Sequence, residues 1–358
     1  MEKSILFVTG SLSDGGAEKV MSILASGCAE LGHHVTLVVM RNNRIVYPVS
    51  EKVNLIQLKE AGRLITIKRV KKLREIIRSV KPDAIIPFLN TISVYSILAN
   101  WGLGYDMIFS VRADPNISMD DASLKDKLGH FCMRKLRWNE KAKWTVFQTP
   151  DAQACYSQTI QSKSSVIPNP LDTAYLPERY EGEREKRIVA AGRFSEEKNF
   201  PMLLRAFAEF HKEFPEYKLT IYGEGSLRGS YEVLARELGI DHLVDMPGFV
   251  GDISERIVRA GMYISTSNHE GISNSMLEAL GMGIPTIVTD CPVGGARMFV
   301  RTDENGILIP MNDEDALVAA MKKVAGDKEY AQRVSMNATR IRGEIAAENI
   351  CKQWLELI

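Results

Sequence analysis

The chain is poor in the residue patterns that build disulfide, zinc and hydrolase sites. Its 358 residues include five cysteines, an odd number with no C-x-x-C pair, so we expect the reduced thiols of a cytoplasmic protein. The six histidines lack the spacing of metal ligands, and no metal site is predicted. The P-loop, the G-x-S-x-G elbow and the G-x-G-x-x-G fingerprint are also missing. Their absence argues against ATP hydrolysis, serine hydrolase chemistry and a dinucleotide cofactor.

Net charge and long apolar runs are missing as well. Basic and acidic residues number 45 each, and this balance predicts no nucleic-acid partner. The most apolar stretch, residues 84–101, contains Pro87 and Asn90 and fits a strand followed by a buried helix better than a membrane span. No charged-then-apolar segment precedes the first predicted strand, so no secretory signal is expected. The sequence predicts a cytoplasmic globular protein, and its length favours two domains.

The most informative stretch lies between a predicted strand at 261–265 and a predicted helix at 276–282. Strand-to-helix turns hold ligands in α/β folds. Glu270 lies in the turn, and Glu278 lies eight residues later in the helix. Amides at a helix start suit a phosphate, and carboxylates accept hydrogen bonds from hydroxyls, so the set fits a phosphate joined to sugars. A glutamate favoured by the helix dipole plus a solvated helix glutamate is the alternative. The residues predicted around this helix start are Gly271, Ile272, Ser273, Asn274 and Ser275.

A second turn carries two cations. The predicted strand 187–191 leads into a glycine turn with Arg193 and Lys198 five residues apart. An arginine can bridge two phosphate oxygens and a lysine adds a point charge, so this turn is predicted to clamp a diphosphate. The alternative is that both are surface cations that pair with Glu196 and Glu197.

Strands and helices alternate in two series, which predicts an α/β fold of two doubly wound parallel sheets. The first series opens with a strand at 4–9, a glycine loop that ends in Gly15 and Gly16, and a helix. Two prolines in the segment 166–172 stop regular structure. We therefore expect domains at 1–168 and 169–343. The last helix is predicted over about 330–358.

Two features of the first series suggest contacts with anions. The pattern at 65–80 predicts an amphipathic helix whose cations, among them Lys68, Arg69 and Lys72, could lie on anionic lipid. The alternative is a solvated helix face. Arg112 follows a predicted strand and would suit a phosphate or an acidic acceptor.

These motifs together resemble one enzyme family. Glu270 to Glu278 resembles the E-x7-E region of the family 4 retaining glycosyltransferases. The Gly15-Gly16-Ala17-Glu18 loop, the 193–198 turn and the 166–172 segment are similar to that family's glycine loop, G-R-x-x-x-x-K loop and interdomain linker. The resemblance implies the GT-B architecture, two Rossmann-like domains with a nucleotide-sugar between them. It also implies that the last helix packs back on the first domain from about residue 344 to 358. Along the whole chain the sequence is similar to the N-acetylgalactosaminyl transferases of bacterial lipid-linked oligosaccharide assembly.

The resemblance also implies roles for individual residues. Glu278 would bind the ribose, Glu270 the transferred sugar, and Arg193 and Lys198 the donor phosphates, with Glu270, Arg193 and Lys198 as the catalytic set. Arg112 stands where many relatives have a histidine that reaches the donor sugar. The further donor-binding positions implied are Gly15, Gly16, Gly223, Gly225, Phe249, Val250 and 271–275.

The implied activity is transfer of a sugar from a nucleotide-sugar, UDP-linked by expectation, to a hydroxyl of a glycan acceptor on a polyprenyl diphosphate. The new bond would be an α-glycosidic bond, made without a metal or a cofactor. Contact with the inner face of the cell membrane is a further expectation. A UDP-sugar 2-epimerase and a non-catalytic nucleotide- or sugar-binding protein on the same fold remain the alternatives.

Overall fold

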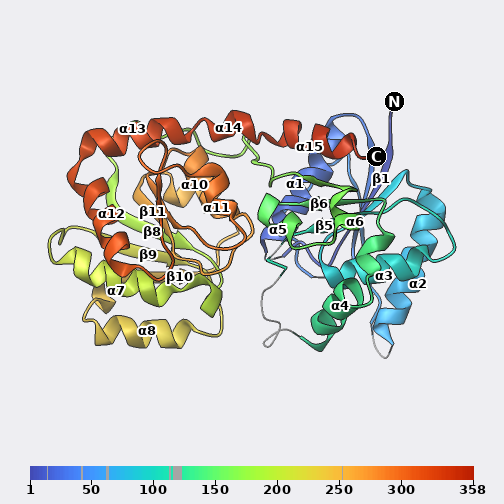
Figure 1. The fold of residues 1–358 in the computed structure, drawn as a ribbon, viewed down its shortest axis with the longest axis horizontal. Coiled ribbons are helices and arrows are strands. Elements are labelled where there is room, and N and C mark those ends of the chain that lie inside the picture. Colours follow the sequence, from blue (N-terminus) through green and yellow to red (C-terminus); the bar gives the residue numbers. More distant parts are fainter. Residues whose placement is uncertain (14, 42, 62–63, 113, 116–122, 252) are drawn as a thin grey trace. The chain divides into compact units, whose positions relative to one another are not determined.

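The computed structural model describes residues 1–358 except 14, 42, 62–63, 113, 116–122 and 252. Contacts divide the chain into two compact units, unit 1 (residues 1–170 and 347–358) and unit 2 (residues 171–346) (Figure 1). The boundary predicted from the sequence lies at 168/169. In the described part of the chain, no helix combines the length and apolar character that crossing a bilayer requires.

Unit 1 is built on a parallel sheet. Four strands pair in the order β3-β2-β1-β4 and three more in the order β5-β6-β7. Two parallel bridges, Ile85 to Met107 and Phe88 to Ser110, join β4 to β5, so all seven strands run side by side. Their carboxyl ends therefore lie along one edge of the sheet. The strands are β1 (Ser4–Thr9), β2 (His34–Val39), β3 (Asn54–Gln57), β4 (Ala84–Pro87), β5 (Ile108–Val111), β6 (Trp144–Phe147) and β7 (Ser164–Val166).

Helices cover this sheet and bury strands that are apolar almost throughout, as parallel strands covered on both faces usually are. The last helix of the chain packs on the first: Cys351 Sγ lies 3.8 Å from the carbonyl oxygen of Leu24, and Lys3 Nζ donates to the carbonyl of Leu355 at 2.5 Å. The helices are α1 (Gly16–Glu30), α2 (Ile65–Val80), α3 (Asn90–Asn100), α4 (Leu124–Arg134), η1 (Trp138–Lys141), α5 (Pro150–Ala154), α6 (Gln158–Gln161) and α15 (Ala347–Leu355).

Unit 2 has a six-stranded parallel sheet in the order β10-β9-β8-β11-β12-β13. Numbered within the unit this is 3-2-1-4-5-6, the doubly wound order. The chain reverses direction across the sheet between β8 and β11, and ligands bind at such a switch point. The strands are β8 (Glu185–Ala191), β9 (Lys218–Tyr222), β10 (Val244–Gly248), β11 (Ala260–Ser265), β12 (Thr286–Thr289) and β13 (Ile307–Ile309).

The predicted single helix over about 330–358 is wrong, because the structure divides it into α13, α14 and α15. Contacts with the segment after β7 compete with helix formation here. The carbonyl of Ile345 accepts from the amide of Leu171 at 2.8 Å, and Arg342 donates to the carbonyls of Pro177 and Gly281. The helices of unit 2 are η2 (Glu196–Lys198), α7 (Phe200–His211), α8 (Arg228–Glu237), η3 (Asp241–Leu243), α9 (Ser254–Ile257), α10 (Asn274–Gly281), α11 (Gly295–Phe299), α12 (Glu314–Gly326), α13 (Lys328–Ala338) and α14 (Ile341–Glu344).

Candidate active site

Two of the predicted catalytic residues meet at the switch point of unit 2. Lys198 ends η2 in the turn after β8, and Glu270 lies in the turn after β11. The ammonium of Lys198 donates to Glu270 Oε2, and Ser267 Oγ lies 3.3 Å from the same oxygen. Both charged side chains are mostly buried, with 17% and 26% of their surfaces exposed. The pair places a fixed cation and carboxylate where two adjacent strands end.

The lysine of this pair stays charged. Burial by itself lowers the pKa of Lys198, but the charge and hydrogen bond of Glu270 outweigh that effect and leave the pKa raised. Lys198 therefore carries its proton throughout the neutral range. A protonated lysine in a half-buried turn is a ready partner for phosphate oxygens.

The start of α10 lies beside this pair in the sequence. Ser273 caps the helix by accepting from the amide of Met276 at 3.4 Å. The hydroxyl of Ser275 is engaged by Tyr263 at 2.7 Å and by Ser273 at 3.1 Å. These hydroxyls therefore shape the turn. An anion at this turn would be bound by the backbone amides and by the positive end of the helix dipole.

The Glu270 turn is held by a segment that the sequence analysis did not assign to the site. The amide of Glu270 donates to the carbonyl of Pro292 at 2.8 Å, and the amide of Val293 donates back to Glu270 at 3.0 Å. A Cβ on Gly295 would lie 1.6 Å from the carbonyl oxygen of Gly271, so only glycine allows the loop after β12 to approach this closely. In the sequence, the two glycines at 294–295 are the feature that could have indicated this close approach.

Glu278 is buried in α10, with 7% of its surface exposed, and Ser254 Oγ donates to its Oε2 at 3.3 Å. The alternative of a solvated helix glutamate is therefore wrong. A buried carboxylate must be matched by donors, and hydroxyls are suitable ones. Phe249, which follows β10, is 46% exposed, and Val250 is half-buried.

Arg193 is exposed in the turn after β8, next to the buried Phe194. Among the described residues no carboxylate pairs with it, so the predicted alternative of ion pairs with Glu196 and Glu197 is not seen there. Its guanidinium is available to a ligand.

The glycines predicted to bind the donor are also required by the fold, because a side chain at these positions would clash with neighbouring atoms. A Cβ on Gly223 would lie 1.8 Å from the carbonyl oxygen of Gly192, and one on Gly225 would lie 2.3 Å from that of Phe194. The turns after β8 and β9 therefore touch backbone to backbone. In unit 1, Gly15 caps α1 and Gly16 begins it, and a Cβ on Gly15 would lie 2.2 Å from Glu18 Oε2.

Arg112 has partners inside unit 1. Its Nε donates to Ser110 Oγ at 2.5 Å and its Nη1 to Asn169 Oδ1 at 2.8 Å, while the guanidinium lies 4.4 Å from the ring centre of Phe88 and 5.5 Å from that of Trp354. Burial lowers its pKa to about 9. The structure thus uses Arg112 to join β5, residue 169 and α15, whereas its contact with a phosphate stays a prediction.

The cations proposed for lipid contact lie on α2. Lys68 and Lys72 are exposed, Arg69 is half-buried, and Lys72 Nζ pairs with Glu75 at 2.9 Å. Within the described ranges, no group of three His, Cys, Asp or Glu side chains is placed to hold a metal ion.

Both units have parallel, doubly wound sheets, so the protein is an α/β protein with two Rossmann-like units. Unit 2 carries an ion pair at its switch point. Residues 14–175 match the family model for Glycosyltransferase Family 4, and residues 175–341 match the model for Glycosyl transferases group 1. The chain belongs to the family 4 glycosyltransferases, has the GT-B fold and acts in glycan biosynthesis.

Relatives cover almost the whole chain. An α-1,4-N-acetyl-D-galactosaminyltransferase of Campylobacter jejuni, named for a GalNAc-GalNAc-diNAcBac-PP-undecaprenol substrate, is 27% identical over 99% of this chain and 98% of that protein. The solved structure of HepE from Anabaena, in complex with UDP and glucose, superimposes with a TM-score of 0.80 at 17% identity over 99% of both chains. Sucrose-phosphate synthase from Thermosynechococcus elongatus gives 0.84 at 18% identity, over 99% of this chain and 98% of that one.

Proposed function

We propose that the protein moves a sugar from a UDP-sugar to a hydroxyl of a glycan carried on a polyprenyl diphosphate, with retention at the anomeric carbon. The observation that carries the proposal is the Lys198–Glu270 pair at the switch point of unit 2. HepE was crystallised with UDP, which supports the choice of nucleotide, and the Campylobacter relative is named for a lipid-linked acceptor.

The charges of the site suit the departure of a diphosphate. Lys198, Arg193 and the α10 amides would bind the diphosphate and stabilise its growing negative charge, with no metal ion or cofactor required. Glu270 would accept from a hydroxyl of the donor sugar and Glu278 from the ribose. Phe249, exposed at the end of β10, would lie against the base.

Retention is proposed to follow from attack on the same face as the leaving group. The bond between the anomeric carbon and the phosphate oxygen breaks, and the acceptor oxygen forms the new bond to that carbon. The proton of the acceptor hydroxyl passes to the departing phosphate, so the products are the glycoside and UDP. No carboxylate nucleophile is needed, and Glu270 acts by orienting the sugar.

The testing experiment is calorimetric titration of the protein with UDP, GDP, ADP and CDP in the presence of EDTA. We expect selective binding of UDP, followed by turnover of a UDP-sugar only when a lipid-linked acceptor is added. Turnover without an acceptor would favour the 2-epimerase, and binding without any turnover would favour the non-catalytic alternative. Absence of nucleotide binding would overturn the proposal.

Glu278→Gln should weaken UDP binding by about tenfold or more, because a hydrogen bond to a charged partner contributes about 1.5–3 kcal/mol. Titration of the variant with UDP measures this. Glu329→Gln, at an exposed position on α13, is the matched control and should leave the affinity unchanged. Equal affinities for Glu278→Gln and the unaltered protein would remove Glu278 from the nucleotide site.

The basic face of α2 is proposed to lie on the anionic inner face of the membrane, where each cation adds about 1 kcal/mol of binding. Replacing Lys68, Arg69, Lys71 and Lys72 together by glutamine should reduce sedimentation with anionic liposomes at least tenfold. A matched set of exposed lysines in unit 2 serves as the control: Lys186, Lys212, Lys218 and Lys328. If both sets behave alike, α2 has no specific part in membrane contact.

A further inference from the structure

A cavity of about 600 Å³ lies in unit 1, on the opposite edge of the sheet from the predicted site residues Gly15 and Arg112. Met107, which lines it, directly precedes β5, so the cavity is at the amino ends of the strands. Gly15 and Arg112 instead follow the carboxyl ends of β1 and β5. The volume falls within the range of small-molecule sites, and no role assigned above uses this region.

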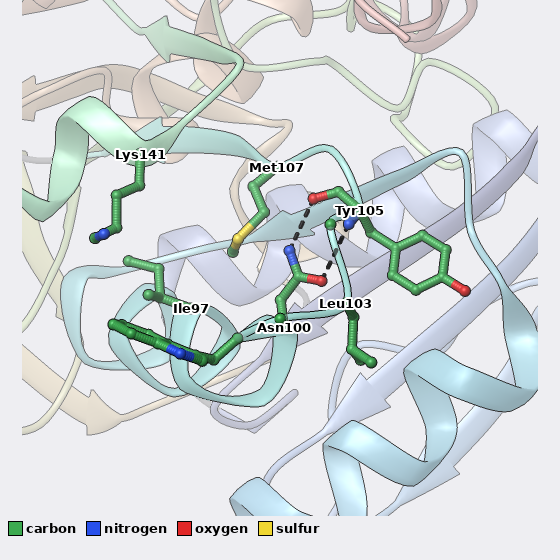
Figure 2. Close-up of a pocket in the computed structure, with 9 residues that line it drawn as sticks. Ile97, Asn100, Leu103, Tyr105, Met107 and Lys141 are labelled. Atoms are coloured by element: carbon green, nitrogen blue, oxygen red, sulfur yellow. Dashed lines mark hydrogen bonds between the residues drawn. The ribbon is translucent and has the colours of Figure 1, made fainter.

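The walls of the cavity are largely apolar. Ile97 of α3 and Met107 are buried, and Leu103 and Trp101 complete the lining together with Lys141 of η1. Figure 2 shows Ile97, Met107, Leu103 and Lys141 bordering the same space. Trp101 is 64% exposed, so a large aromatic surface faces solvent beside buried apolar side chains. A hydrocarbon that covers these side chains would remove their apolar surface from water, which is favourable.

The loop that carries Trp101 is fixed in place. Arg74 Nη1 donates to the carbonyls of Ala99 at 2.8 Å and Trp101 at 2.6 Å. The side chain of Asn100 donates to the carbonyl of Tyr105 at 2.8 Å and accepts from its amide at 3.3 Å (Figure 2). Because the backbone of this loop is already fixed, a ligand that covers Trp101 does not have to order the loop, which favours binding.

The charges around the cavity favour an anion. Lys141, whose Nζ lies 5.4 Å from the ring centre of Trp101, is the charged residue that lines the cavity. The nearby carboxylate of Asp106 is neutralised by Lys143 at 2.7 Å. A ligand therefore meets the ammonium of Lys141 and an apolar wall. A lysine serves as a point charge for phosphate, and its apolar stem can lie along a hydrocarbon.

We propose that this cavity binds a phosphate carried on a hydrocarbon chain, with the chain against Trp101, Ile97 and Met107 and the phosphate at Lys141. A free phosphate would leave the apolar wall in water, and a neutral amphiphile would leave Lys141 without a counter-charge. Membrane phospholipids and polyprenyl phosphates share the required chemistry. The inference concerns a second site and stands independently of the nucleotide site of unit 2.

The test is calorimetric titration of the full chain with four probes, each below its micelle-forming concentration: dihexanoyl phosphatidic acid, farnesyl phosphate, octyl glucoside and inorganic phosphate. At least one of the two phosphate amphiphiles should bind, and the preferred one identifies the source. Lys141→Gln should weaken that binding about tenfold, and Trp101→Ala should weaken it further. Lys186→Gln is the matched control, because Lys186 Nζ lies 5.3 Å from the ring centre of Tyr217 in unit 2.

Each other outcome overturns the proposal. If neither phosphate amphiphile binds, the cavity is a surface depression without this ligand. If octyl glucoside binds equally and Lys141→Gln has no effect, the phosphate has no part in recognition. If inorganic phosphate binds as tightly as the phosphate amphiphiles, the hydrocarbon chain of the ligand has no part in recognition. Lys141 is exposed, so its variant should fold normally. The same samples are also titrated with UDP. UDP binding tests the nucleotide site of unit 2 and therefore distinguishes a failure of this proposal from a failure of the proposed function.

Discussion

Lys198→Met should lower kcat by about 10²–10³-fold while the variant still binds UDP, because the loss of one preorganised group that stabilises developing charge has an effect of this size. The lysine is buried against Glu270 and stays protonated, so no reorganisation is needed when negative charge grows on the departing diphosphate. Methionine keeps the length and apolar stem of the side chain. The measurement is initial-rate kinetics with a UDP-sugar and a lipid-linked acceptor, with UDP affinity determined separately.

Removing the lysine also leaves Glu270 partly buried without its partner, and that effect must be separated from catalysis. Glu270→Gln and the double variant Lys198→Met/Glu270→Gln complete a double-mutant cycle. If the loss of rate in Lys198→Met came only from the unpaired carboxylate, the double variant would be as active as Glu270→Gln alone. We expect the double variant to be slower than Glu270→Gln. Lys186→Met, at an exposed position in unit 2, should retain full activity.

Much of the site could be predicted because it lies at strand ends. The apolar runs that form β8 and β11 are short; Gly192 follows the first, and a polar segment that contains Gly271 follows the second. The turns with Lys198 and Glu270 could therefore be located from local patterns. That the two residues touch could not be derived from those patterns. They are 72 positions apart, and their contact depends on the strand order of the sheet, which places β8 next to β11. The family resemblance implied only that both residues belong to the donor site.

The features missed by sequence reasoning are those decided by long-range packing. The burial of Glu278 depends on Ser254 in α9, and the two hydrogen bonds that hold Glu270 come from residues 292 and 293. Arg112 follows a strand like a ligand-binding residue, yet its partners come from residue 169 and α15, far along the chain. A local pattern identifies a side chain at a strand end but does not identify its neighbours.

Gly223→Ala should lower the free energy of unfolding of unit 2 by about 3 kcal/mol, the sum of strain in a sparsely populated backbone region and overpacking. Gly223 has a φ of 147°, and an added Cβ would lie 1.8 Å from the carbonyl oxygen of Gly192. The turns after β8 and β9 would have to separate. Urea-induced unfolding monitored by circular dichroism measures the loss.

This substitution distinguishes two explanations of the glycine. A glycine required only for close approach of a diphosphate would leave the stability of the free protein unchanged in the alanine variant, and only UDP binding would weaken. A glycine required for contact between the two turns must affect stability first, and UDP binding would then weaken because Arg193 and Lys198 follow Gly192 in the displaced turn. Gly229→Ala is the matched control. A Cβ at this exposed position in α8 meets nothing within 4 Å, so that variant should be neutral or stabilised by up to about 1 kcal/mol.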